Sequence, residues 1–270
     1  MAGYSAPRQF DDLAPTEFVA RIFYRVFERG RSKPLLVSAS SGQDHLTQIV
    51  LKLLRPGDTS APWRLCACRD LLGAMCARKA GLSTPDYGVV MVDQFFVESL
   101  VGTAEHPRLA ANLGWNFGSV LIEPTLDVAP DEPDLWRDVL GFDAMMFNGD
   151  RTAENPNVLW DGETLLAIDH GLMAPTWAFD TQGYPDETLF GPGRIGSHAG
   201  YPYLRNRHAQ YDKMRRQWPA ELDDPFLDWA IHQIPASWAD AVERGRLKTF
   251  VSRRLAIATA QAEELEGVLR

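Results

Sequence analysis

The chain has 270 residues, of which 45% are hydrophobic and 23% are charged, as in a globular protein of one or two domains with a large core. Its net charge of -9 argues against nucleic-acid binding, which needs clustered Lys and Arg side chains. We see no secretory signal and no membrane-spanning stretch, and the three cysteines lack the spacing of a zinc site. These features predict a cytoplasmic protein that binds neither membranes nor nucleic acid.

The first hundred residues predict strands and one long helix. We expect, in chain order, a helix at 16–28, a strand at 34–38, a polar turn at 38–45, a strand at 47–54, a helix at 63–80 and a strand at 87–92. The two early strands form a hairpin across the Ser- and Gly-containing turn. Gly81 suits the end of the 63–80 helix, because glycine adopts the left-handed conformation found after helices.

The remaining residues predict a mostly helical region with one small hairpin. We expect short helical or irregular pieces at 94–101 and 108–113, a Pro/Asp-rich linker at 124–133, a helix at 134–147, a polar loop at 148–157, a hairpin at 158–168, a long functional loop or lid at 174–203 and helices over 221–270. The pattern indicates an α+β fold in two lobes, a strand-containing N-lobe over 1–103 and a helical C-lobe over 104–270, with a cleft between them.

Three polar residues between Phe147 and Gly171 carry the candidate chemistry. Asp150 and Asn155 lie in the predicted loop, and Asp169 follows the hairpin. Because the hairpin returns the chain, we expect Asp169 to lie beside Asn155, so that two oxygen ligands share one Mg²⁺ on the nucleotide phosphates. Asp150 would orient or deprotonate an attacking hydroxyl. Each piece alone is more typical of an ordinary turn, but the order and spacing together predict a phosphoryl-transfer enzyme that uses ATP and Mg²⁺.

A nucleotide site also needs a cation and a phosphate-binding turn. Lys52 lies in the second predicted strand, and Asp70 on the next helix is its candidate ion-pair partner, although Asp is one methylene shorter than the usual Glu. A solvated strand lysine is the plainer interpretation. The turn of Ser40, Ser41 and Gly42 is a candidate to cover the phosphates with backbone N–H groups. It is neither a Walker sequence nor a G-x-G-x-x-G loop.

One stretch of the sequence is similar to a known family. The run from Asn148, NGDRTAENPNVLW followed by LLAIDHG, resembles the HipA-like kinases, specifically the short single-chain bacterial HipA-like kinase domains. These are relatives of the HipA toxin kinases and, more remotely, of phosphoinositide 3/4-kinases. The similarity extends from 34 to 171 and is strongest over 148–171. It implies a bilobal protein-kinase-like fold, with ATP and Mg²⁺ as cofactors and a protein Ser or Thr hydroxyl as acceptor.

The resemblance also implies roles for individual residues. Asp150 would be the catalytic base, Asn155 and Asp169 the metal ligands, and Lys52 the lysine that contacts phosphate. Arg151 matches the Asp-Arg pair of the lipid-kinase relatives. The resemblance does not identify the acceptor.

Two other functions stay open. A small-molecule kinase of the aminoglycoside-phosphotransferase type uses the same Asp, Asn and Asp, but usually has His where this chain has Asn148. A pseudokinase that acts as a partner-binding module stays open because of Asp70 and the unusual turn at Ser40. His170 is expected to pack or to hydrogen-bond the turn after the hairpin, and His198 either reaches the cleft or lies on a loop.

Overall fold

The computed structural model describes residues 8–28, 32–42, 45–54, 63–123, 131–174 and 192–270. Five strands form a closed barrel: β1 (Thr16–Val26), β2 (Leu35–Ser40), β3 (Leu46–Lys52), β4 (Tyr87–Val92) and β5 (Gly114–Val120). Their order around the barrel is β1-β2-β3-β5-β4. The parallel pairing of β1 with β4 closes it, and all other neighbours are antiparallel.

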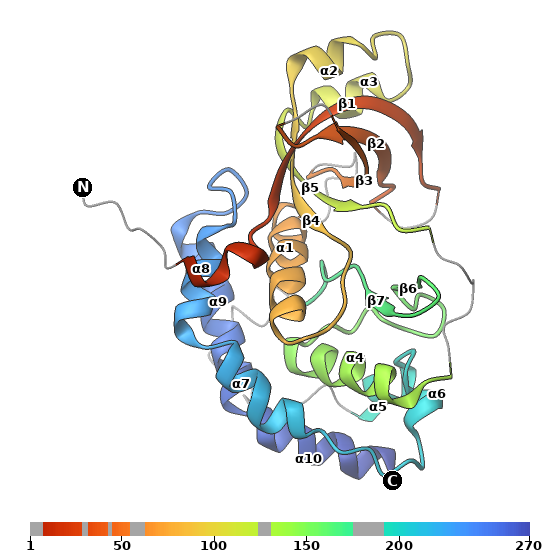
Figure 1. The fold of residues 1–270 in the computed structure, drawn as a ribbon, viewed down its shortest axis with the longest axis vertical. Helices are drawn as coiled ribbons and strands as arrows, with labels where there is room; N and C mark the ends of the chain where they lie inside the picture. Colours follow the sequence, from red (N-terminus) through yellow and green to blue (C-terminus); the bar gives the residue numbers. More distant parts are fainter. Residues whose placement is uncertain (1–7, 29–31, 43–44, 55–62, 124–130, 175–191) are drawn as a thin grey trace, which may run out of the picture.

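Helices and one hairpin make up the rest of the molecule. The helices are α1 (Trp63–Lys79), α2 (Gln94–Glu98), α3 (His106–Ala110), α4 (Pro133–Met146), α5 (Pro192–Ser197), α6 (Tyr201–Leu204), α7 (Trp218–Glu221), α8 (Asp224–His232), α9 (Ala241–Ala256) and α10 (Ala258–Leu269), with short helical turns at Arg8–Leu13 and Lys213–Gln217. The hairpin consists of β6 (Val158–Trp160) and β7 (Leu165–Ala167). Figure 1 shows the barrel at one end, α4 and α10 at the other, and the hairpin between them.

The predicted helix over 16–28 is wrong, because this segment forms β1. Its valine, isoleucine and aromatic residues favour strands, and Phe18 and Ala20 point into the barrel, two residues apart. The pairing with β2 shifts register twice, between Ala20 and Ile22 and between Phe23 and Arg25. Such bulges interrupt the period of two, which is why the apolar residues of this strand have a spacing close to that of a helix.

The predicted fold class is also wrong. We expected an α+β, bilobal protein-kinase-like fold with a sheet in its N-lobe, whereas the strands close into a mixed barrel within a mixed α/β protein. Closure needs β1 and also β5, for which the sequence predicted no strand. Two glycines weaken the strand signal of β5, but Gly118 is required there. A Cβ at Gly118 would lie 2.4 Å from Val90 and 2.7 Å from Ile49.

Two apolar cores organise the molecule. One fills the barrel and includes Phe18, Val37, Ile49, Leu51 and Val90. The other surrounds α1 and α4 and continues through α7, α8, α9 and α10. Hydrogen bonds connect the helices to neighbouring segments: Trp218 donates through Nε1 to the Ala80 carbonyl at 2.9 Å, and Trp238 donates to the Trp115 carbonyl at 2.8 Å.

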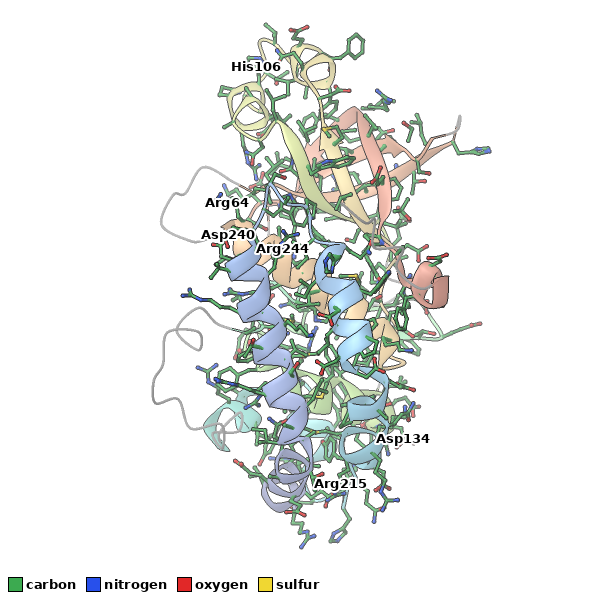
Figure 2. All side chains as sticks on the ribbon, turned by 90° about the vertical axis from the view of Figure 1, so that its left-hand side faces the viewer. Arg64, His106, Asp134, Arg215, Asp240 and Arg244 are labelled. Carbon is green, nitrogen blue, oxygen red and sulfur yellow. The ribbon has the colours of Figure 1, made fainter. Side chains whose placement is uncertain are left out.

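Several predicted elements are confirmed. The β2–β3 hairpin, α1 with Gly81 at φ +80°, α4 and the β6–β7 hairpin all lie where the sequence predicted them. The C-terminal helical region is also present, but it is divided into several helices. α9 begins at a capping box formed by Asp240 and Glu243 (Figure 2 labels Asp240). None of the helices within the described ranges is long and apolar enough to cross a membrane.

Three predicted segments lie partly outside the described residues. The turn over 38–45 includes 43–44, the linker over 124–133 includes 124–130, and the loop or lid over 174–203 includes 175–191. The described remainder of 174–203 is not a simple loop, since it contains α5 and the first three residues of α6.

Closure of the barrel predicts a specific loss of stability. Gly88 of β4 pairs with Thr16 of β1, and a Cβ at Gly88 would lie 2.0 Å from the Thr16 carbonyl oxygen. We expect Gly88→Ala to lower the free energy of unfolding by about 1–3 kcal/mol in urea titrations. Gly245→Ala is the control, because Gly245 lies on α9 in open space. It should raise this free energy by about 0.5–1 kcal/mol. A stable Gly88→Ala variant would contradict the pairing of β1 with β4.

Candidate functional site

A lysine held between two carboxylates lies where three elements meet. Lys52 is the last residue of β3, Asp70 lies on α1 and Asp169 follows β7. The Lys52 Nζ lies 3.0 Å from Asp70 Oδ2 and 2.9 Å from Asp169 Oδ1. The sequence predicted the pairing with Asp70, and the structure adds Asp169. The Asp169 side chain is 37% exposed, whereas that of Asp70 is 4% exposed, so the cluster opens to solvent on its Asp169 side.

The electrostatics of this Lys52 cluster favour a charged lysine. Burial opposes its charge, but attraction to Asp169 and Asp70 outweighs burial and holds the pKa of Lys52 above its ordinary value. Burial raises the pKa of Asp70 to about 6 against the opposing effect of Lys52. At Asp169 burial acts in the same direction, but attraction to Lys52 outweighs it and lowers the pKa. With both carboxylates ionised, one negative charge is left over, which suits an incoming cation.

Asp70 also fixes the turn that carries Asp169. The backbone N–H of His170 donates to Asp70 Oδ1 at 2.9 Å. Asp169 has φ +58°, in the left-handed region. A Cβ at Gly171 would lie 3.1 Å from Asp70 Oδ2, so the absence of a side chain there allows the turn to approach Asp70. One carboxylate on α1 therefore positions both Lys52 and the turn after β7.

The Asp150 carboxylate is oriented by two amides from its own loop. Asp150 Oδ2 accepts from Asn155 Nδ2 at 3.3 Å and from Asn157 Nδ2 at 3.2 Å. The sequence alone predicted no role for Asn157. Its φ of +45° is typical of an asparagine in a tight loop, which is the one local feature that distinguishes it. The Ile168 N–H donates to the Asn157 carbonyl at 3.0 Å, which joins the end of the loop to the residue that follows β7.

Asn155 and Asp169 are the two side chains that would hold a metal ion in the predicted site. No group of three or more His, Cys, Asp or Glu side chains suited to a metal occurs among the residues that the structure describes. Asn155 donates through Nδ2 to Asp150, so its Oδ1 is the oxygen left for a metal, and Asp169 has a carboxylate beside Lys52. Two such oxygens are hard ligands, and Mg²⁺ commonly takes its other ligands from phosphates and water.

The structure does not bring the predicted phosphate turn to Lys52. Ser40 pairs with Leu46 at one end of the β2–β3 hairpin, whereas Leu35 pairs with Leu51 at the other. Lys52 lies six positions after Leu46 along β3, about 20 Å at the usual rise per residue. Ser41 and Gly42 continue the turn at Ser40's end. The phosphate-binding role of Ser40, Ser41 and Gly42 therefore has no support from their position.

The connection between β1 and β2 begins and ends at the Lys52 end of the barrel. Val26 of β1 pairs with Leu35 of β2, which in turn pairs with Leu51. The Phe27 N–H donates to the Pro34 carbonyl at 2.8 Å, so the β1–β2 connection begins and ends there. This connection was not predicted, because the sequence indicated a helix over 16–28 in place of β1.

A second buried charge cluster supports the Asp150 loop from behind. Asp143 of α4 is fully buried, and its carboxylate accepts from Arg151 Nε at 2.5 Å and from Asn148 Nδ2 at 3.0 Å. Arg151 Nη1 also donates to the carbonyls of Asn157 and Ile168, which lie side by side at the open end of the hairpin, before β6 and after β7. Burial alone would raise the pKa of Asp143, but Arg151 and His198 hold it well below its ordinary value. Arg151 is thus a buried support of the loop.

His198 attaches a distant segment to the same carboxylate. Its Nδ1 accepts from the Gly200 N–H at 2.9 Å, so Nε2 carries the proton and donates to Asp143 Oδ2 at 2.9 Å. Thr152 and His198 form an isolated β-bridge, and the Ala199 N–H donates to the Arg151 carbonyl at 3.0 Å. The segment that follows α5 is therefore docked on the Asp150 loop.

His170 has a packing role in this structure. Its ring lies edge-on to Phe142 with centroids 5.8 Å apart. Neither ring nitrogen hydrogen-bonds to a described residue, and a Cβ at Gly73 would lie 2.4 Å from the His170 Cβ. Burial lowers the pKa of His170 to about 4, so its ring is neutral near pH 7.

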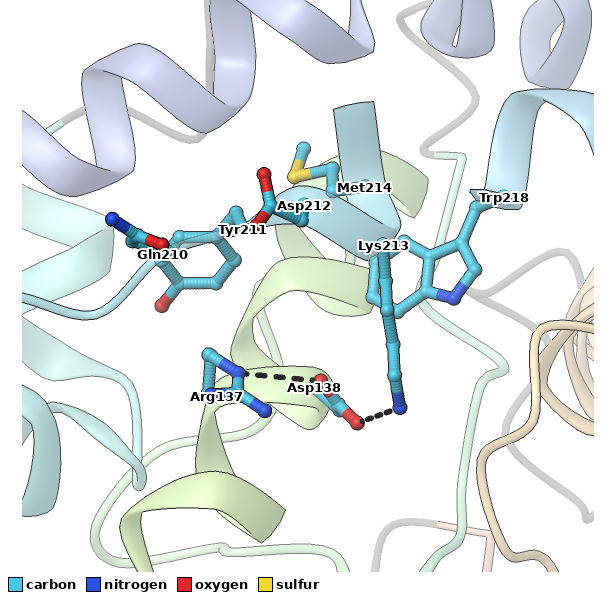
Figure 3. A pocket seen from close by; sticks show the side chains of 8 residues that line it. All are labelled: Arg137, Asp138, Gln210, Tyr211, Asp212, Lys213, Met214 and Trp218. Carbon is cyan, nitrogen blue, oxygen red and sulfur yellow. Dashed lines mark hydrogen bonds and ion pairs between the residues drawn. The ribbon is translucent and has the colours of Figure 1, made fainter. Parts of the chain in front are cut away.

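A separate cavity of about 190 Å³ lies beside α4. Figure 3 shows its lining, in which Asp138 pairs with both Arg137 and Lys213. Tyr211 and Trp218 form part of the apolar lining. None of the site residues predicted from the sequence lines this cavity.

The His198 arrangement predicts how stability depends on pH. Burial lowers the pKa of His198 in the folded protein, against the opposing effect of Asp143. The unfolded chain, with a His pKa of about 6.5, therefore takes up the proton first, and the contribution of His198 is lost as pH falls below that value. We expect the stability difference between wild type and His198→Gln to shrink from pH 7 to pH 5 in urea titrations. A difference that stays constant over this range would contradict the neutral, Nε2-protonated ring.

Comparison with known proteins agrees with the resemblance seen in the sequence. The family model described as HipA-like kinase matches residues 63–256, a range that includes Asp70, Asp150, Asn155 and Asp169 and begins after Lys52. A search of curated proteins finds no match. The matched range covers most of the chain, and the family predicted from the Asn148 run is confirmed. The chain belongs to the HipA-like kinase family.

Proposed function

We propose that this kinase transfers the γ-phosphoryl group of ATP, with Mg²⁺, to a Ser or Thr hydroxyl of a protein. The observation that carries the proposal is the Lys52 ammonium, held between Asp70 and Asp169 at the base of the hairpin that follows the Asp150 loop. The family match supports phosphotransfer as the class of reaction. The Ser or Thr acceptor rests on the resemblance alone.

Lys52 and Asp169 form the nucleotide end of the proposed site. The two carboxylates keep Lys52 charged and hold its Nζ in place, so it is oriented before any phosphate arrives. Bound Mg²⁺ would place positive charge between the phosphate oxygens and would be held by Asn155 and Asp169. Lys52 would then contact the α- and β-phosphates.

Asp150 forms the acceptor end. Its carboxylate, oriented by Asn155 and Asn157, accepts the proton of the substrate hydroxyl. The hydroxyl oxygen forms a bond to the γ-phosphorus, the bond from that phosphorus to the bridging oxygen breaks, and ADP leaves with the electron pair. Arg151 contributes by holding the loop and the open end of the hairpin in a fixed relation.

The proposal places the enzyme in the cytoplasm, where ATP is abundant. Cys68 and Cys76 are free thiols that lie buried on α1, in keeping with a reducing compartment. The acceptor's hydroxyl, rather than a membrane or a nucleic acid, is the proposed second partner.

The proposal predicts that nucleotide binding and transfer can be separated. We expect Mg-ATP to raise the melting temperature of the wild type, because a ligand that binds the folded state stabilises it. Asp169→Asn should largely remove this shift. Asp150→Asn should retain the shift and lower transfer by about 10²–10⁴-fold. Transfer is measured by comparing the phosphorylated Ser and Thr sites of proteins in cells that express each variant.

Two results would contradict the proposal. The role of Asp150 fails if Asp150→Asn leaves the phosphosites of the wild type unchanged. The nucleotide role of Asp169 fails if Asp169→Asn keeps the full melting shift. Asp134→Asn is the matched control, because Asp134 pairs with Arg137 on the exposed face of α4, and it should match the wild type in both assays.

A further inference from the structure

Arg194 of α5 lies beside the backbone that leads into Asp150. Its guanidinium carbon is 5.2 Å from the centroid of the Phe147 ring. An ideal Cβ on Gly149 would lie 2.4 Å from Arg194 Nη1. Because consecutive Cα atoms are about 3.8 Å apart, this nitrogen lies within about 8 Å of the Asp150 Cα. A phosphoryl group next to the Asp150 carboxylate would be within reach of this guanidinium.

The Asp150 loop has no Lys or Arg side chain placed to bind such a phosphoryl group. Arg151 is the one Lys or Arg in 148–157. Its guanidinium is buried against Asp143 and the hairpin carbonyls. Phosphoryl transfer spreads negative charge over three equatorial oxygens. A second cation, in addition to Lys52, would stabilise that charge. Arg194 is exposed, and no ion pair with a carboxylate is seen for it within the described ranges.

The position of Arg194 is fixed by its surroundings. α5 ends at Ser197, and the next residue, His198, is bound to Asp143 and bridged to Thr152. The Phe147 backbone has φ +56°. Its ring also contacts the buried Arg254, whose guanidinium carbon is 5.3 Å from the ring centroid. Stacking of this kind orients the planar guanidinium and leaves its N–H groups available at its edge.

We propose that Arg194 binds the γ-phosphoryl group of the nucleotide and so acts as a catalytic residue supplied to the Asp150 loop by α5. The inference rests on the proposed function. Its guanidinium donates to two non-bridging oxygens of the γ-phosphoryl group, the geometry in which arginine binds phosphate best. Arg194 keeps its protons and forms no covalent bond. The lack of a side chain at Gly149 leaves room for it.

The test compares a nucleotide that has a γ-phosphoryl group with one that lacks it. Calorimetry measures the affinities of the Mg complexes of a non-hydrolysable ATP analogue and of ADP. We expect Arg194→Met to weaken binding of the ATP analogue by about 10- to 100-fold, as for loss of a hydrogen bond to a charged group, with ADP unchanged. Arg194→Lys should retain part of the affinity. Arg253→Met, at an exposed position on α9, is the matched control and should bind both as the wild type does.

A second variant tests position separately from charge. Gly149→Ala keeps Arg194 but forces its guanidinium aside, so it should show the same selective loss for the ATP analogue. The inference is overturned if Arg194→Met weakens both nucleotides equally or weakens neither. In that case the proposed function stands, because the wild type still binds both nucleotides. A wild type that binds neither nucleotide with Mg²⁺ would overturn the proposed function, and the inference with it.

Discussion

The arrangement of the site depends on the pairing of one buried lysine with two carboxylates. Lys52 is carried by the barrel, Asp70 by α1 and Asp169 by the turn after β7. Removing one partner from a buried ion pair costs about 3–5 kcal/mol, since the remaining charge is left without compensation. Keeping these charges together therefore fixes the end of β3, the middle of α1 and the end of the hairpin relative to one another, which is the precondition for binding phosphate there.

The Asp143 cluster complements this constraint at the same end of the hairpin. Arg151 donates to the carbonyls of Asn157 and Ile168, which precede β6 and follow β7, while its Nε pairs with Asp143. The open end of the hairpin is thus held by α1 through Asp70 and by α4 through Asp143. The Asp150 loop connects α4 to this end of the hairpin. In this arrangement the proposed catalytic carboxylate is exposed enough to meet a substrate, while the charges that position it are buried.

Local sequence signals predicted most of this central region. The helix before the Asp150 loop, the loop itself and the β6–β7 hairpin have short-range patterns, and the family resemblance came from the same run. The barrel was harder to predict from the sequence, because the bulges in β1 interrupt its period of two and the glycines weaken the strand signal of β5. The prediction that Ser40, Ser41 and Gly42 form the phosphate-binding turn followed from these errors. The register that separates Ser40 from Lys52 emerges only when the strands are paired.

Long-range contacts could not be predicted from the sequence. His198 and Asp143 are 55 residues apart, and no periodicity connects them. Asn157 and Arg194 acquire their significance from neighbours that the fold brings close, an Asp150 carboxylate in one case and the Gly149 backbone in the other. The sequence therefore predicted the candidate groups near Asp150 but not the buried and neighbouring groups that contact them.

The most direct test is a crystal structure of the chain with Mg²⁺ and a non-hydrolysable ATP analogue. We expect phosphate oxygens within hydrogen-bonding distance of Lys52 Nζ and a metal ion bound by Asp169 and Asn155. A nucleotide bound elsewhere, for example in the cavity between Arg137 and Lys213, with Lys52 still bound only to its two carboxylates, would contradict these roles.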